Sequence, residues 1–312
     1  MQRVPLVFMI LIILLSSCMT YTHEEAKLRI EAESSVPEIP LPSTKKPLEK
    51  IGKPVDVPSE IPSFSAALVP VPCQRTPDMI EAIVKETIAS GIDIIGFTGQ
   101  EAALAAIAKA LPMPVFWFED GGMLATRFPM RIEAPPFITI EMNGNTTILV
   151  SLLDLEASNQ YEELHAAPQE KWPDVVDAAS ASKLETLAPV LDFTGNGPIV
   201  VLASLGEPSG EDWFETAEDH PYRTGIRWTL VEALGEQGYL DSWRSTHHDA
   251  VTHPGTTWEF ADLGQSFSER IDYLFTKGLL PLETQTITIT SVDTNTFPYE
   301  LRSAVTGTFV IP

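Results

Sequence analysis

A chain of 312 residues, 44% of them hydrophobic, is long enough to form one large core or two small ones. Its formal net charge of −23 argues against nonspecific nucleic-acid binding, because an acidic surface repels phosphate backbones. The acidity lies beyond residue 60, where 13 basic and 35 acidic side chains give a net charge of −22 and no run of Lys or Arg forms a basic patch.

The N-terminus has the pattern of an export signal. Arg3 precedes an apolar run from Val4 to Leu15, which is too short to span a bilayer comfortably. The run ends in Leu-Ser-Ser-Cys, which resembles the bacterial lipoprotein signal, in which a small-residue site precedes a cysteine that becomes lipidated. The alternative is an ordinary signal peptide with a chance cysteine. We expect a lipoprotein signal peptide over 1–17, lipidation of Cys18, and an exported, membrane-anchored protein in the cell envelope.

Residues 18–61 follow as a tether rich in Pro, Glu, Ser and Lys, with almost no aromatic side chains. The remaining cysteine is Cys73, so acylation of Cys18 would exclude an internal disulfide. We therefore expect a folded domain over 62–312 that is stabilised by packing alone.

Helices and strands alternate in the first half of this domain, and antiparallel strands follow. The expected helices, from their apolar spacing and caps, are 77–90, 98–111, 174–187 and 228–237. Thr98 and Glu101 are spaced as a capping box for the second of them. The expected strands are 92–97, 115–118, 123–126, 137–142, 146–152, 199–203, 270–275, 284–289 and 303–311. This order indicates a mixed domain of α and β elements.

Seven segments, in the right order, resemble motifs of the endonuclease/exonuclease/phosphatase (EEP) family. They are Asp93–Phe97, Gly122–Pro129, Pro198–Trp213, Gly238–Trp243, Pro254–Trp258, Glu269–Phe275 and Ser303–Phe309. The resemblance implies an α+β domain with a DNase I-like fold, a four-layer α/β sandwich of two packed mixed β-sheets flanked by helices. It also implies hydrolysis of phosphoesters with a divalent cation, usually Mg²⁺, bound by carboxylates.

The positions that carry this chemistry in the family are substituted. In a gapless alignment its metal-binding Glu falls on Gly99, and its Asn-x-His falls near Val150 and Leu152. Its Gly-Asp-Phe-Asn motif places Asp and Asn on Ser204 and Gly206, and its closing Asp-His falls on Leu301 and Arg302. At these positions no side chain remains that could bind the metal or act as the general base. An insertion of two residues before Gln100 would restore a Glu at 101.

One family residue is retained. Asp272 matches the Asp that orients the catalytic His, and the His position is now Arg302. Because an unpaired buried carboxylate is costly, we predict an Asp272–Arg302 ion pair, a structural replacement for the catalytic dyad.

Other side chains are further candidates for a site. A cleft could be lined by Glu207, Asp212, Trp213, Arg127 and Trp258. The alternative for Glu207, Asp212, Trp213 and Arg127 is a structural role, in which they hold the local loops in place. His247, His248, Asp249 and His253 could form a metal cluster, but adjacent histidines usually point apart. A Ser-His-Asp triad on Ser204 lacks the Gly-x-Ser-x-Gly elbow.

The sequence therefore predicts a pseudoenzyme with no metal and no cofactor, which binds a small-molecule ligand or a protein partner. The alternative is a hydrolase that uses Mg²⁺ or Mn²⁺ with non-standard residues such as Glu101, Glu207 or Asp212.

Overall fold

The computed structural model describes residues 62–72, 76–119, 121–134, 136–142, 146–155, 167–215, 228–262, 265–289 and 299–312. All of them belong to one compact unit, Asp56–Pro312. The predicted signal peptide, Cys18 and the tether lie outside the described residues. In the part that is described, no helix combines the length and the hydropathy needed to cross a membrane.

The first sheet has eight strands, in the order β11-β10-β14-β1-β2-β4-β3, with β13 also paired to β14. β1 and β2 are parallel and the other pairs are antiparallel, so the sheet is mixed. The strands are β1 (Ser63–Pro70), β2 (Ile94–Thr98), β3 (Val115–Trp117), β4 (Met123–Thr126), β10 (Trp258–Asp262), β11 (Gln265–Glu269), β13 (Leu280–Thr288) and β14 (Tyr299–Val310).

The second sheet has six strands, in the order β5-β6-β7-β8-β12-β9. Its parallel pair is β7 and β8, and the others are antiparallel. The strands are β5 (Met130–Ala134), β6 (Phe137–Glu141), β7 (Thr147–Asp154), β8 (Ile199–Ser204), β9 (Leu240–Asp241) and β12 (Asp272–Lys277).

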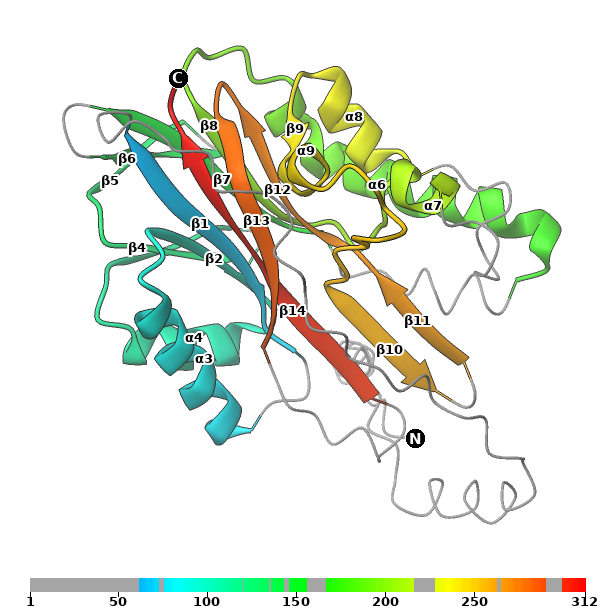
Figure 1. Ribbon diagram of the computed structural model, residues 1–312, viewed down its shortest axis with the longest axis horizontal. Helices are drawn as coiled ribbons and strands as arrows, with labels where there is room; N and C mark the ends of the chain where they lie inside the picture. Colours follow the sequence, from blue (N-terminus) through cyan, green and yellow to red (C-terminus); the bar gives the residue numbers. More distant parts are fainter. Residues whose placement is uncertain are drawn as a thin grey trace, which may run out of the picture. The chain divides into compact units, whose positions relative to one another are not determined.

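Three apolar clusters show how the layers stack. The first joins inward-facing side chains of both sheets, among them Leu68, Ile94, Leu152 and Leu202. The second lies between the first sheet and the helices α3 (Pro77–Ser90) and α4 (Glu101–Ala110). The third lies between the second sheet and α6 (Trp172–Leu191) and α8 (Leu230–Glu236). Helices thus flank two packed sheets, which is the predicted four-layer α+β sandwich (Figure 1).

Shorter helices lie between the longer elements in the second half of the domain. They are a 3-10 turn (Gln169–Lys171), α7 (Gly210–Glu215) and α9 (Ser242–Thr246).

The helix predicted over 77–90 is confirmed with both of its ends. The Thr76 hydroxyl accepts a hydrogen bond from the Met79 amide, and Pro77 occupies the first turn, where no amide donor is needed. Gly91 ends the helix in the left-handed conformation at φ +66°.

The capping box predicted for the next helix is wrong. α4 begins at Glu101, and its N-cap is Gln100, with no hydrogen bond from the cap side chain. Thr98 is instead the last residue of β2, fully buried, and its hydroxyl faces Ser204 at 3.2 Å. The strand runs one residue further than predicted, because Thr98 finds a polar partner in the opposite sheet.

Candidate functional site

The ends of β7 and β8 and the start of β12 lie side by side. The strand register pairs Asp154 with Ser204, and Ser204 with Asp272. Thr98, at the end of β2 in the other sheet, faces the same group. Ser204, at the tip of β8, therefore lies between two carboxylates.

Ser204 is fully buried and hydrogen-bonded from two directions. Its hydroxyl donates to Asp272 Oδ1 in a short hydrogen bond, and it lies 3.2 Å from Thr98 Oγ1. These partners are a carboxylate and a hydroxyl, and no contact between Ser204 and a histidine occurs in the described residues. The geometry gives no support to a Ser-His-Asp triad.

The contact predicted between Asp272 and Arg302 is present. Arg302 Nη1 lies 3.6 Å from Asp272 Oδ2, and both side chains are buried. Trp258 pairs with Arg302 across β10 and β14, and the guanidinium lies 6.0 Å from the centre of its ring. Trp258 thus contacts the cation that pairs with Asp272.

Asp154 is a site residue that sequence reasoning missed. The predicted strand ended at Leu152, but β7 continues for two more residues, so Asp154 is level with Ser204. Leu152 and Val150 are buried between the sheets. The signal that could have found Asp154 is a lone carboxylate directly after an apolar strand.

Burial raises the pKa of Asp154 above 3.8. Two contacts partly oppose this shift: the Gly99 amide donates a hydrogen bond to Asp154 Oδ2 at 3.1 Å, and Arg302 contributes a positive charge. The raised pKa means that ionised Asp154 disfavours folding. This contribution is absent below pH 3.8 and develops as the pH rises through the folded-state pKa.

We predict that Asp154→Asn gains stability relative to the parent protein between about pH 4 and pH 8, because the amide can still accept from Gly99 without carrying charge. Urea unfolding at a series of pH values measures this, with the exposed Asp174→Asn as the control. A stability difference that does not change with pH would contradict the prediction.

The backbone at Gly99 disfavours any side chain. Its φ is +126°, and a Cβ at this position would lie 2.7 Å from the backbone oxygen of Val71. Gly206 also has a positive φ, at +62°. Leu301 is half-buried and pairs with Glu259 of β10. The backbone at 99 is thus shaped for a residue without a side chain.

Gly99→Ala is therefore expected to cost about 1–3 kcal/mol of unfolding free energy from backbone strain, plus the clash with Val71. Gly91→Ala is a matched control, because Gly91 has a φ of +66° but nothing within 4 Å of its Cβ position. Equal losses in the two variants, measured by chemical denaturation, would mean that the close approach to Val71 has no effect.

Glu207 forms a buried pair with Lys183 of α6. The two charged groups are 3.5 Å apart, and Ser180 donates to the same carboxylate oxygen at 2.9 Å. Lys183 also donates to the Leu205 carbonyl at 2.9 Å. Burial raises the pKa of Glu207 and lowers that of Lys183, and their mutual attraction partly offsets both shifts. Glu207 therefore fixes the turn after β8 against α6.

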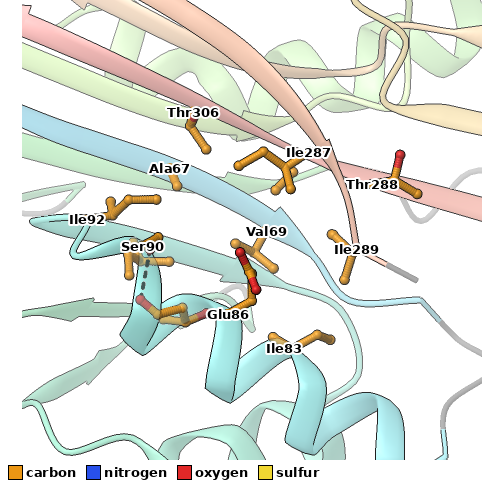
Figure 2. Close-up of a pocket in the computed structure, with 13 residues that line it drawn as sticks. Ala67, Val69, Ile83, Glu86, Ser90, Ile92, Ile287, Thr288, Ile289 and Thr306 are labelled. Carbon is orange, nitrogen blue, oxygen red and sulfur yellow. Dashed lines mark hydrogen bonds between the residues drawn. The ribbon is translucent and has the colours of Figure 1, made fainter. Parts of the chain in front are cut away.

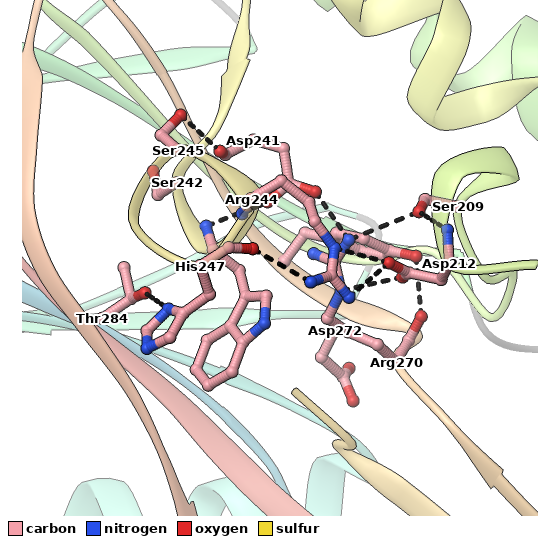
Figure 3. A network of polar contacts seen from close by, with 12 residues as sticks. Ser209, Asp212, Asp241, Ser242, Arg244, Ser245, His247, Arg270, Asp272 and Thr284 are labelled. Atoms are coloured by element: carbon pink, nitrogen blue, oxygen red, sulfur yellow. Dashed lines mark hydrogen bonds and ion pairs between the residues drawn. The ribbon is translucent and has the colours of Figure 1, made fainter. Parts of the chain in front are cut away.

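Asp212 belongs to a second buried network (Figure 3). Arg244 Nη2 and Arg270 Nε lie 2.6 Å and 2.9 Å from its two carboxylate oxygens. Arg270 also pairs with Asp241 at 2.7 Å, and its guanidinium lies 4.5 Å from the ring centre of Tyr273. Burial alone would raise the pKa of Asp212, but the two guanidinium groups outweigh it and lower that pKa. The carboxylate is committed to these cations.

The remaining candidates lie apart from the strand ends. Arg127 pairs with Asp93 just before β2, whereas Thr98 ends that strand, so Arg127 is at the opposite end. Glu101 is exposed in the first turn of α4. The Trp213 side chain lies outside the described residues.

The histidines form an aromatic cluster beside α9. His247 stacks on Trp243 with ring centres 4.1 Å apart, and its Nδ1 lies 3.2 Å from the Thr284 hydroxyl. His253 is 5.1 Å from the His247 ring. Burial, with the nearby His253 and Arg244, lowers the pKa of His247 below 6.5.

The strand ends do not fit a hard divalent cation. Mg²⁺ requires several oxygen ligands, but Asp154 accepts from a backbone amide and Asp272 is engaged by Ser204 and Arg302. In the described part of the chain, no three His, Cys, Asp or Glu side chains form a group that could hold a metal.

Solved structures with the same architecture identify the fold. TDP2 from D. rerio, in a crystal structure described as complexed with single strand DNA product, matches with a TM-score of 0.50 and 10% identity over 79% of this chain and 98% of that one. The domain has an EEP-like fold. An EEP family protein from Bacteroides thetaiotaomicron and a functionally unknown protein from Enterococcus faecalis are also similar. Their TM-scores are 0.45 and 0.48, with 12% and 14% identity, over 80% of this chain and 96% and 100% of theirs.

Sequence comparison adds little to this EEP-like assignment. No family model matches the chain. An uncharacterized protein of Caenorhabditis elegans, F14F9.5, is 30% identical over 89 residues, which are 26% of this chain and 28% of the nematode protein. At 10% identity, the likeness to TDP2 shows the fold and not the activity.

An apolar groove lies elsewhere in the EEP-like domain, between α3 and the strands β1, β13 and β14 (Figure 2). Isoleucines from both sides line it, and Glu86 is the one ionisable side chain among its lining residues. Its volume of about 70 Å³ leaves room for little more than two water molecules. The groove supplies no group for catalysis.

Proposed function

We propose that this protein is a membrane-anchored lipoprotein whose EEP-like domain binds a ligand or partner and does not hydrolyse phosphoesters. The observation that carries this proposal is the contact set at the strand ends. Ser204 and Arg302 engage Asp272 where the family would hold its reactive groups, and Leu152 is packed into the core. These contacts engage Ser204, Asp272 and Arg302 with one another, so none of these three side chains is positioned as a general base toward a substrate.

Two of the three carboxylates named for a non-standard hydrolase are engaged as well. Glu207 is paired with Lys183 against α6, and Asp212 is held by Arg244 and Arg270. A metal would have to displace these cations from buried positions. This favours the pseudoenzyme over the metal-dependent alternative.

Turnover of a generic phosphodiester in the presence of Mg²⁺ or Mn²⁺ tests the proposal. We expect no metal-dependent turnover above that of a heat-unfolded sample. Turnover that depends on metal and is abolished by Glu207→Ala would overturn the pseudoenzyme assignment and establish the hydrolase.

The membrane anchor rests on the apolar run before Cys18 and on the tether that follows it. Cys18→Ser, expressed in a bacterium with the full leader, is expected to abolish incorporation of labelled fatty acid and to shift the protein from the membrane to the soluble fraction. Cys73→Ser is the matched control. Retained labelling in Cys18→Ser would contradict the anchor.

The ligand itself is a small molecule or a protein, and nucleic acid is disfavoured by the acidic charge. Residues 61–312 have a net charge of −22, which would repel a phosphate backbone at low salt.

A further inference from the structure

A second hollow lies on the second sheet, far from the strand ends described above. Its volume is about 270 Å³, and its lining includes Arg131, Phe137, Thr139, Thr147, Leu149, Phe193 and Asn196. Leu149 is near the start of β7 and Asp154 is at its end, so at about 3.3 Å per residue the two places are roughly 16 Å apart. The hollow is therefore separate from the altered EEP centre.

Three strands supply its floor in one row. The register pairs Arg131 of β5 with Thr139 of β6, and Thr139 with Leu149 of β7, so the three side chains lie on the same face. Phe137 lies on this face too, and its ring contacts that of Phe193 with centres 4.4 Å apart. The two rings give the pocket an apolar aromatic wall.

Thr139 is the feature that points to a polar ligand. Its side chain lines the pocket and the residue is only 2% exposed, yet its hydroxyl has no hydrogen-bond partner in the described part of the chain. A buried hydroxyl without a partner costs about 1–3 kcal/mol. A ligand hydroxyl would satisfy it once the Thr139 side chain rotates toward the pocket, because the oxygen is sealed from solvent in this structure.

The charges around the pocket favour a neutral ligand. Arg131 Nε lies 2.8 Å from Glu141 Oε1, so this cation is paired with a carboxylate. Thr147 and Asn196 are exposed and carry side chains that both donate and accept hydrogen bonds. The acidic domain would also repel an anion.

We propose that this pocket binds a neutral sugar ring. The pocket offers an apolar face from its aromatic wall. It also offers several hydrogen-bond donors and acceptors, from the Thr139 hydroxyl and the Asn196 amide, and its charged groups are paired, so it carries no net charge. The volume equals that of about nine liquid water molecules, which accommodates a ring of about 12 non-hydrogen atoms. The inference deepens the proposed binding function, on which it rests, by naming a site and a class of ligand.

Binding is tested by NMR titration of the full domain with neutral methyl glycosides, with glucuronate and inorganic phosphate as anionic probes. We expect at least one neutral methyl glycoside to bind in the millimolar range and to shift the resonances of Thr139, Thr147 and Asn196. Thr139→Val should weaken this binding by about tenfold, because it removes one hydrogen bond to the ligand.

Thr276→Val is the matched control. Thr276 is also a fully buried threonine of this sheet, and its hydroxyl has no hydrogen-bond partner among the described residues. Unlike Thr139, it does not line the pocket. Asn196→Ala, on an exposed loop, provides a second test if Thr139→Val fails to fold. The proposal is overturned if no neutral glycoside binds, if only glucuronate or phosphate binds, or if neither pocket variant weakens binding. None of these results depends on phosphodiester turnover, so they are distinct from a failure of the pseudoenzyme assignment.

Discussion

Arg302→Met is expected to lower the free energy of unfolding by about 3–5 kcal/mol, because it leaves Asp272 as a buried carboxylate without its cation. Asp272 is fully buried and Arg302 is 6% exposed, so water cannot replace the lost contact. Urea denaturation measures the change. Adding Asp272→Asn to Arg302→Met should recover much of the loss, since the amide has the same shape and no charge to be solvated.

Arg131→Met is the control for this experiment. Arg131 forms an ion pair of the same kind with Glu141, but their side chains are 56% and 43% exposed, so we expect a loss of no more than about 1 kcal/mol. If Arg302→Met costs no more than Arg131→Met, the Asp272–Arg302 pair does not stabilise the folded domain.

Lys183→Met is the second substitution with a large expected effect, again about 3–5 kcal/mol at neutral pH. It leaves the fully buried Glu207 facing Ser180 without the ammonium group. The ordinary pKa of the carboxyl is 4.5 and burial raises it in the folded protein, so the penalty belongs to the ionised form. It should shrink as the pH falls and vanish well below 4.5, where both the folded and the unfolded state bind the proton.

Glu207→Gln in the Lys183→Met background should restore most of the stability at neutral pH and remove the pH dependence. Lys171→Met provides the matched control, because its ion pair with Asp174 is exposed, with side-chain exposures of 62% and 72%. A penalty in Lys183→Met that is the same at acid and neutral pH would show that lost packing, and not an unpaired carboxylate, is responsible.

Much of the EEP-like fold could be predicted because its signals are local. The helix Pro77–Ser90 carries its own N-cap and C-cap, and the strand Ile199–Ser204 is an unbroken apolar run. The strands β10 and β11 were missed because their sequences, Trp258–Asp262 and Gln265–Glu269, mix polar and aromatic residues without an apolar run.

The site could be predicted only in part, and for a different reason. The family motif placed Asp272 and Arg302, so their contact could be predicted from chemistry. The partners of Asp212 could not, because Arg244 and Arg270 come from separate segments that only the tertiary fold brings together. Asp154 was missed because pairing with β8 continues β7 beyond its apolar run.

Calorimetric titration of the folded domain with Mg²⁺ and Mn²⁺ tests the proposal that the EEP-like domain binds no catalytic metal. We expect no saturable binding at millimolar metal, because Gly99 carries no side chain and Asp272 is engaged by Ser204 and Arg302. Stoichiometric binding of either ion, abolished by Asp272→Asn, would contradict it.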